Sequence, residues 1–162
     1  MRQSEIQFIR QLGFTNVHPD HRLYVALMFQ PRTIAGILAL GIVLQSPWVF
    51  LVLSGVLWFA TVVPTGNLFD AAYNRLIAYP QELPRIPIAP APRRFAQAMA
   101  ATMALAVGSA LLAGASVTAW VLEGLFAMGT TTVVVGRICA PAGLYLRLTA
   151  HAHARTVVGG TS

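Results

Sequence analysis

FAQAMAATMALAVGSALLAGASVTAWVLEGLFAMGTTTVV, residues 95–134, decides the fold class, because Glu123 is the only charged residue in it. A nearly uncharged run of about 18 residues is long enough to cross a bilayer. This run is long enough for two crossings if the chain folds back near residues 114–116. The stretch therefore predicts two apolar helices joined by a turn, with lipid as their solvent.

The whole chain has the composition of a small integral membrane protein. It is 56% hydrophobic and only 10% charged over 162 residues, whereas soluble domains are roughly 25% charged. The net charge of +6 comes from eleven basic residues, all of them Arg. No Arg-rich face with interleaved aromatic residues appears, so we expect these charges to flank membrane helices and not to bind nucleic acid.

The chain divides into a short N-terminal part, two apolar hairpins and the polar segments that follow them. We expect residues 1–30 to begin with an amphipathic helix, because Ile6, Ile9 and Leu12 recur at helical intervals. Residues 23–29 are too short to span, so they either lie in the membrane interface or pack under the bundle. The predicted segments are an N-terminal segment (1–30), a first transmembrane hairpin (31–77), a proline-rich cytoplasmic linker (78–94), a second transmembrane hairpin (95–148) and a cytoplasmic tail (149–162).

The fold class that follows is all-α and integral to the membrane, with four short transmembrane helices in two hairpins. The spans of the first hairpin, on either side of the turn Gln45–Pro47, hold roughly 14 to 18 residues, or about 21 to 27 Å against a hydrocarbon core of about 30 Å. The pattern P-R-x-x-A occurs at residues 31–35 and again at 92–96. We interpret this and later matches as a duplicated hairpin, which makes the two halves a parallel repeat.

The Arg residues also predict the orientation of the chain. Every Arg lies before the first span, between the second and third spans or after the fourth span, and the two hairpin turns contain none. By the positive-inside rule, both termini and the linker are then cytoplasmic. We expect a multi-pass protein of the cytoplasmic (inner) membrane.

Two groups of residues predict how the helices pack and where the bilayer ends. Small side chains allow close approach of membrane helices, and in the third span they recur every four residues, at Ala96, Ala100, Ala104 and Gly108. Aromatic side chains that mix apolar and polar character anchor helices at the membrane surface, and the candidates here are Trp48 and Trp120 on the non-cytoplasmic side and Tyr145 on the cytoplasmic side.

Glu123 is the sharpest candidate for chemistry. An intramembrane carboxylate is costly in lipid, so it indicates either a proton or cation site or a hydrogen bond to a neighbouring helix. No second ionisable group lies in any span to complete a relay. The thiol of Cys139, the single cysteine, has no nearby base in sequence and is predicted to be buried or interfacial. The sequence predicts no catalytic residue set, no metal site and no cofactor bound by this chain alone.

Two motifs carry a resemblance to a known family. They are Pro92–Gln97, which reads PRRFAQ, and Cys139–Tyr145, which reads CAPAGLY. The chain resembles a bacterial family of uncharacterised four-helix membrane proteins, known only as a domain of unknown function, over roughly residues 31–148. The family motifs are similar to P-x-R-F-A-Q and C-x-x-C-x-L-Y, so Ala142 stands in place of the second cysteine. The resemblance implies a fold and a membrane location, and the missing thiol removes the dithiol that a disulfide relay needs.

The function that we predict is a non-catalytic accessory or scaffold subunit of a larger cytoplasmic-membrane complex, for example an energy-transducing one. Its partners are then the lipid bilayer and other subunits of that complex, which could supply a bound lipid or pigment. One alternative is a small proton- or cation-coupled transporter that uses Glu123, and a weaker one is thiol chemistry at Cys139.

Overall fold

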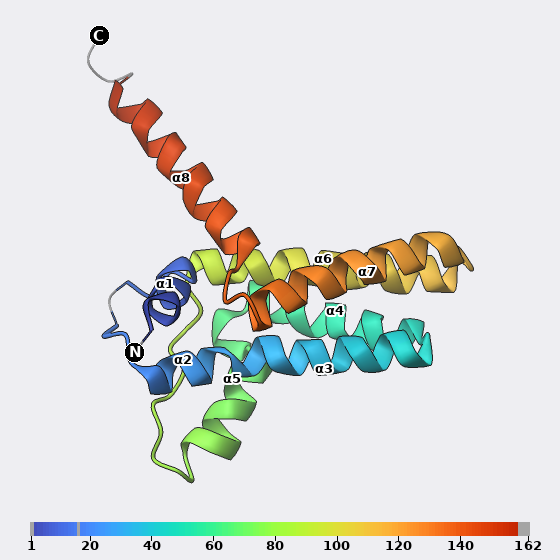
Figure 1. Cartoon of the computed structure of the whole chain (residues 1–162), viewed down its shortest axis with the longest axis horizontal. Coiled ribbons are helices and arrows are strands. Elements are labelled where there is room, and N and C mark those ends of the chain that lie inside the picture. Colours follow the sequence, from blue (N-terminus) through green and yellow to red (C-terminus); the bar gives the residue numbers. More distant parts are fainter. Residues whose placement is uncertain (1, 16, 159–162) are drawn as a thin grey trace.

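The computed structural model describes residues 2–15 and 17–158, with side chains up to residue 150. The described chain is helical and contains no strand (Figure 1). A 3₁₀ turn at Pro64–Gly66 and a π-helical turn at Asn74–Ala78 flank α5. The α-helices are α1 (Gln3–Gln11), α2 (His21–Leu27), α3 (Phe29–Leu44), α4 (Pro47–Val62), α5 (Leu68–Tyr73), α6 (Ala91–Leu112), α7 (Ser116–Val134) and α8 (Ala140–Val158).

Four of these helices, α3, α4, α6 and α7, lie side by side with their axes roughly aligned (Figure 1). Each packs against two of the others, in the order α3, α4, α6, α7 and back to α3. The interior is apolar and includes Phe50, Leu57, Ala104 and Val107. The contact between α4 and α6 is the most extensive, and there the Ser54 hydroxyl donates to the Ala101 carbonyl at 2.9 Å. We call this unit the bundle.

Within the described residues, three helical stretches are long and apolar enough to cross a membrane. They are His21–Leu44 with 24 residues, Ala91–Leu112 with 22 and Ser116–Val134 with 19. These are longer than the short spans expected above, because α2 continues almost directly into α3 and α6 begins earlier than predicted. Only α4 is short, since its 16 residues rise about 24 Å at 1.5 Å per residue.

The break between α2 and α3 has a simple cause in the sequence. Pro31 has no N–H to donate to the carbonyl of Leu27 four residues earlier, and the helix is interrupted at Met28. The first long helix therefore begins before Pro31 and not at it. Leu27 and Met28 are buried in a second apolar core, together with Phe8 and Ile9 of α1. Most side chains of residues 23–29 therefore pack in this second core, and the segment belongs to the long stretch His21–Leu44.

The linker is shorter than the predicted segment 78–94. Residues 83–90 carry no helix, as their prolines require, but α6 starts at Ala91 and so includes Pro92. Proline is tolerated in the first turn of a helix because its missing N–H has no partner there. Gly13, at φ +90°, lies so close to this turn that an added Cβ would be 2.9 Å from Cδ of Pro92. The end of α1 is thereby fixed against the start of α6.

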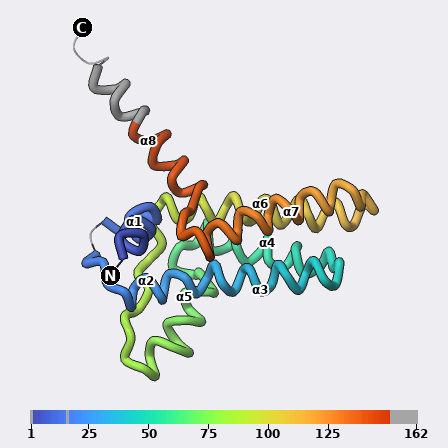
Figure 2. The backbone as a smooth tube through the Cα atoms, viewed as in Figure 1, coloured from blue at the N-terminus to red at the C-terminus, as the bar shows by residue number. Residues whose placement is uncertain are grey.

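The predicted second hairpin, residues 95–148, extends past the end of α7 and includes the start of another helix. Helix α7 stops at Val134, and Arg137 adopts a left-handed backbone conformation with φ +57°. Pro141 then lies in the first turn of α8, which runs away from the bundle and continues into the predicted tail (Figure 2). The correction is that residues 140–148 belong to a separate helix, because the left-handed residue redirects the chain.

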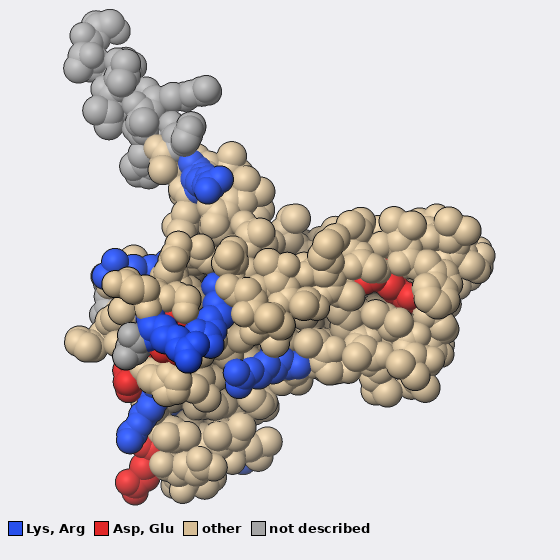
Figure 3. Space-filling view, viewed as in Figure 1, with Lys and Arg blue, Asp and Glu red and all other residues tan. Residues whose placement is uncertain are grey.

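Charge is distributed unevenly over the molecule. In the space-filling view, Arg side chains gather around the end of the bundle that carries α1 and α2, and the opposite end shows none (Figure 3). The Arg-free part is covered by large exposed apolar side chains, among them Val43, Val52, Val117 and Val121. One end of the bundle is therefore basic, and the opposite end exposes large apolar side chains.

Candidate functional site

The most developed polar constellation lies where α3, α5 and α6 begin. We call it the polar centre. Each of its side chains belongs to a residue that is at most 7% exposed, and together they are Gln30, Asn67, Asp70, Arg93 and Gln97. Buried polar groups are costly unless they bond to one another. The stability of the polar centre therefore depends on how these groups are paired.

An ion pair forms the middle of the polar centre. Nη1 of Arg93 donates to Oδ2 of Asp70 at 2.9 Å, and Nη2 donates to Oδ1 at 2.6 Å. This is the two-bond geometry in which a planar guanidinium matches a carboxylate. The two residues lie on opposite sides of the linker in sequence, so the pair holds α6 against α5.

Three amide side chains complete the polar centre. Nη2 of Arg93 also donates to Oε1 of Gln30 at 2.7 Å, and Nε2 of Gln97 donates to the same oxygen at 3.1 Å. Nδ2 of Asn67 donates to Oδ2 of Asp70 at 2.9 Å. Helices α3, α5 and α6 therefore share one hydrogen-bond network.

The N-terminal segment contacts the polar centre through an aromatic ring. Cζ of Arg93 lies 6.0 Å from the centroid of Phe14, a distance at which a cation and a ring attract. On the other side of α6, Nε of Arg94 donates to the carbonyl of Thr61 at 2.9 Å. That bond satisfies one of the free carbonyls at the end of α4.

Glu123 lies far from the polar centre, near the turn between α3 and α4. It is 2% exposed, and its two carboxylate oxygens accept from Nε2 of Gln45 at 3.1 and 3.3 Å. The same Nε2 donates to the Ile42 carbonyl at 2.8 Å. Gln45 has a left-handed backbone with φ 46°. Glu123 thus connects α7 to the turn of the first hairpin through an uncharged partner.

Cys139 lies between α7 and α8, in the apolar core that also holds Phe8 and Leu23. Its backbone N–H donates to Oε1 of Gln11 at 3.2 Å. Burial raises the pKa of the Cys139 thiol, against the opposing effect of the Ala142 backbone N–H. A raised pKa disfavours the thiolate, which is the nucleophilic form.

A second charged cluster fixes α1 to the bundle. Oε1 of Glu5 is 3.7 Å from Nη1 of Arg137, and Oε2 is 3.4 Å from Nδ1 of His21. Burial opposes ionisation of Glu5. The hydrogen bond from the backbone N–H of Arg2, together with the side chains of His21 and Arg137, outweighs this effect, so that the pKa of Glu5 is lowered. The cluster joins α1, α2 and the turn that precedes α8.

No group of three or more His, Cys, Asp or Glu residues suited to a metal ion occurs within the described residues.

The small residues of the third span differ in their environment. Ala104 and Gly108 are buried, whereas Ala96 and Ala100 are half-buried. A Cβ at Gly108 would lie 2.9 Å from Cδ2 of Leu51 in α4, so these two helices meet there without space for a larger residue. The buried face of α6 also includes Ala101 and Val107.

The aromatic candidates also differ from one another. Trp48 and Trp120 are exposed at the Arg-free end of the bundle, where an interface anchor would lie. The ring of Tyr145 packs on Phe95 with centroids 5.6 Å apart. Tyr145 therefore fixes the start of α8 to α6.

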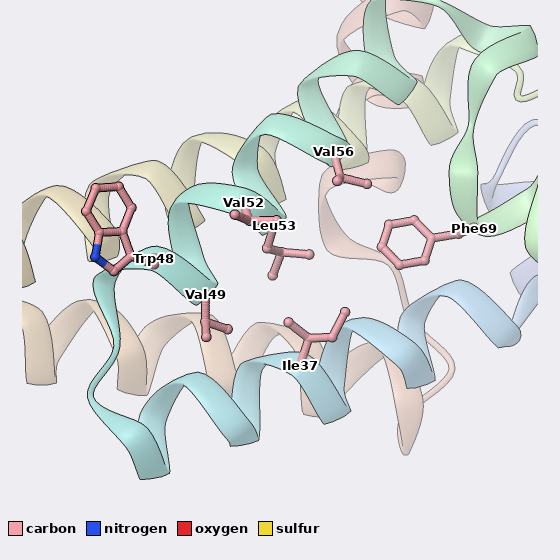
Figure 4. Close-up of a pocket in the computed structure, with 7 residues that line it drawn as sticks. All are labelled: Ile37, Trp48, Val49, Val52, Leu53, Val56 and Phe69. Atoms are coloured by element: carbon pink, nitrogen blue, oxygen red, sulfur yellow. The ribbon is translucent and has the colours of Figure 1, made fainter.

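An apolar groove lies between α3 and α4. Its volume is about 460 Å³, and Figure 4 shows the side chains of both helices pointing into it, with Phe69 of α5 at one end. The lining is Ile37, Trp48, Val49, Val52, Leu53, Val56 and Phe69. Such a surface suits hydrocarbon and offers no polar group for catalysis.

Comparison with known proteins identifies a family without an assigned activity. The family model described as a domain of unknown function (DUF4395) matches residues 25–150. No curated protein and no solved structure matches the chain. The polar centre and the Glu123–Gln45 contact lie within the matched residues.

Proposed function

The chain belongs to the DUF4395 family of unknown function, and we propose that it is a non-catalytic membrane subunit that scaffolds a larger complex. The observation that carries this proposal is the polar centre. Its ion pair is buried and joins α5 to α6, with Gln30 bringing in α3, so these polar groups hold the helices together. The exposed surface of the bundle is apolar and suits lipid or the helices of partner subunits.

We propose four membrane spans, formed by α3 with α2, by α4, and by α6 and α7. The short α4 crosses because the turn Pro64–Gly66 connects its cytoplasmic end to α5. The exposed Leu68 of α5 and Leu76 of the π-helical turn after it suit the membrane interface. The basic end then faces the cytoplasm, with both termini there, in the cytoplasmic membrane. On this proposal α3 and α6 cross in the same direction, as the starts of two parallel repeats.

Partner subunits and lipid are the ligands that this surface fits. The apolar groove between α3 and α4 suits an acyl chain, or a pigment that a partner supplies. The exposed Arg residues around the cytoplasmic end suit the anionic headgroups of the inner leaflet. We propose no cofactor held by polar residues of this chain.

A second function is favoured by one specific observation. The Glu123 carboxylate is buried and its only hydrogen-bond partner among the described residues, Gln45, is uncharged. Intramembrane carboxylates of this kind occur in proton and cation pathways. A small coupled transporter is therefore the alternative, and thiol chemistry at the buried Cys139 is a weaker third.

Glu123→Gln separates the scaffold from the transporter. Glutamine keeps the size of the side chain and still accepts a hydrogen bond from Gln45, but it cannot ionise. We expect the variant to retain the wild-type set of partners after purification in mild detergent, and to support normal growth.

The matched control for this experiment is Gly108→Leu, which disturbs the contact of α6 with α4 and is expected to lose the partners. A proton-coupled flux that disappears in Glu123→Gln, with partner binding intact, would replace the scaffold by the transporter. If the wild-type protein purified without any stoichiometric partner, the scaffold proposal would be wrong, and Gly108→Leu would have no partners to lose.

A further inference from the structure

The polar centre contains two atoms that its own network leaves without partners. Nε2 of Gln30 and Oε1 of Gln97 are buried and make no hydrogen bond to any described residue. Gln30 is 4% exposed and Gln97 is 5% exposed. One of these atoms is a donor and the other is an acceptor, and they belong to two amides that already contact each other.

Reversing the orientation of either amide does not give these two atoms hydrogen-bond partners. Oε1 of Gln30 accepts from Nη2 of Arg93 at 2.7 Å and from Nε2 of Gln97 at 3.1 Å. If the Gln30 amide were turned over, its NH₂ group would face the guanidinium, which is also a donor. If the Gln97 amide were turned over, its oxygen would face Oε1 of Gln30, which is also an acceptor. The arginine therefore fixes both orientations.

We infer that the polar centre binds one water molecule, which accepts from Nε2 of Gln30 and donates to Oε1 of Gln97. Water is the smallest molecule that donates and accepts at once, and buried waters typically bridge polar groups that the protein leaves unsatisfied. The site is distinct from Glu123 and from the apolar groove. The inference does not depend on the scaffold proposal, because it follows from the hydrogen-bond geometry alone.

The water site connects the two hairpins at their starts. Gln30 is the second residue of α3, and Gln97 lies in the second turn of α6. Their direct contact is a single hydrogen bond. The bridging water adds a second connection, which makes the joint between the hairpins depend on hydration of the polar centre.

An experimental structure of the full chain, at a resolution where ordered water is visible, tests the inference. We expect a density peak within hydrogen-bond distance of both Gln30 Nε2 and Gln97 Oε1, and its loss in Gln97→Met, which keeps the chain length without the polar atoms. Two amides bonded to each other in both directions, or another protein group in that position, would overturn the inference.

An NMR measurement in solution tests the bound water without crystals and without the Gln97→Met variant. In protein with ¹⁵N-labelled glutamine, the side-chain amide protons of Gln30 are expected to show a cross-peak to water with the sign of a long-lived contact. The exposed amide of Gln81 is the matched control, since its contacts with water are short-lived. The same sign for both amides would contradict a bound water.

Discussion

Asp70→Ala is expected to destabilise the protein by about 3–5 kcal/mol, because it leaves the guanidinium of Arg93 buried without its counter-charge. Arg93 would retain only the hydrogen bond to Gln30 and the contact with Phe14. Unfolding of the purified protein in detergent, followed by circular dichroism, measures the effect. The loss of stability should be at least severalfold larger than the loss caused by removing any exposed charge.

Two further variants control this prediction. Asp20→Ala removes an exposed carboxylate at the start of α2, and we expect it to change stability by no more than about 0.5 kcal/mol. The double variant Asp70→Leu with Arg93→Met replaces the ion pair by apolar groups and should recover most of the lost stability. Equal stability of Asp70→Ala and Asp20→Ala would show that the polar centre does not hold the helices together.

Gly108→Leu is the second change with a large expected effect. An added Cβ would meet Cγ and Cδ2 of Leu51 at 2.9 Å and the carbonyl of Pro47 at 3.2 Å. The backbone atom cannot move aside without displacing α4, so leucine should force α4 and α6 apart. We expect a loss of about 1–3 kcal/mol or more, the range for overpacked interiors.

Gly124→Leu is the matched control for Gly108→Leu. Gly124 lies next to Glu123 in α7, and an added Cβ there meets no atom within 4 Å. Leucine at this position should leave stability nearly unchanged, since it extends into lipid. Similar melting temperatures for the two leucine variants would contradict the close approach of α4 and α6.

Much of the helical architecture could be predicted from sequence because it depends on composition and on the residues that begin and end helices. The nearly uncharged run 95–134 contains α7 and most of α6, and the turn at Gln45–Pro47 separates α3 from α4 as expected. The start of α6 was misplaced because Pro92 is compatible both with a linker and with the first turn of a helix. A family of unknown function was also predicted, and the model of one such family matches residues 25–150.

The polar centre could not be predicted because its members lie far apart in sequence and look like ordinary flanking residues. Arg32 and Arg93 occupy the same place in the repeated pattern P-R-x-x-A, yet Arg32 is exposed and Arg93 is buried. Only the position of α5, set by the turn Pro64–Gly66 and the π-helical turn after it, brings Asp70 to Arg93. Spacing in sequence carries no information on that contact.

The contact of Glu123 with Gln45 shows the same limit. The sequence indicated that this carboxylate needs a polar partner, but no periodic pattern points to a residue in the turn of the other hairpin. The left-handed conformation of Gln45 directs its amide toward α7. A pairing of α3 with α7 is a property of the packed bundle and not of either helix alone.

The central claim is that the apolar bundle crosses the membrane with its basic end in the cytoplasm. Reporter fusions at residue 46, at residue 115 and at the carboxyl end of the chain test it most directly. We predict non-cytoplasmic signals from the first two fusions, in the Arg-free turns, and a cytoplasmic signal from the third. A non-cytoplasmic signal from the carboxyl-terminal fusion, or protein that alkaline carbonate releases from membranes, would contradict the account.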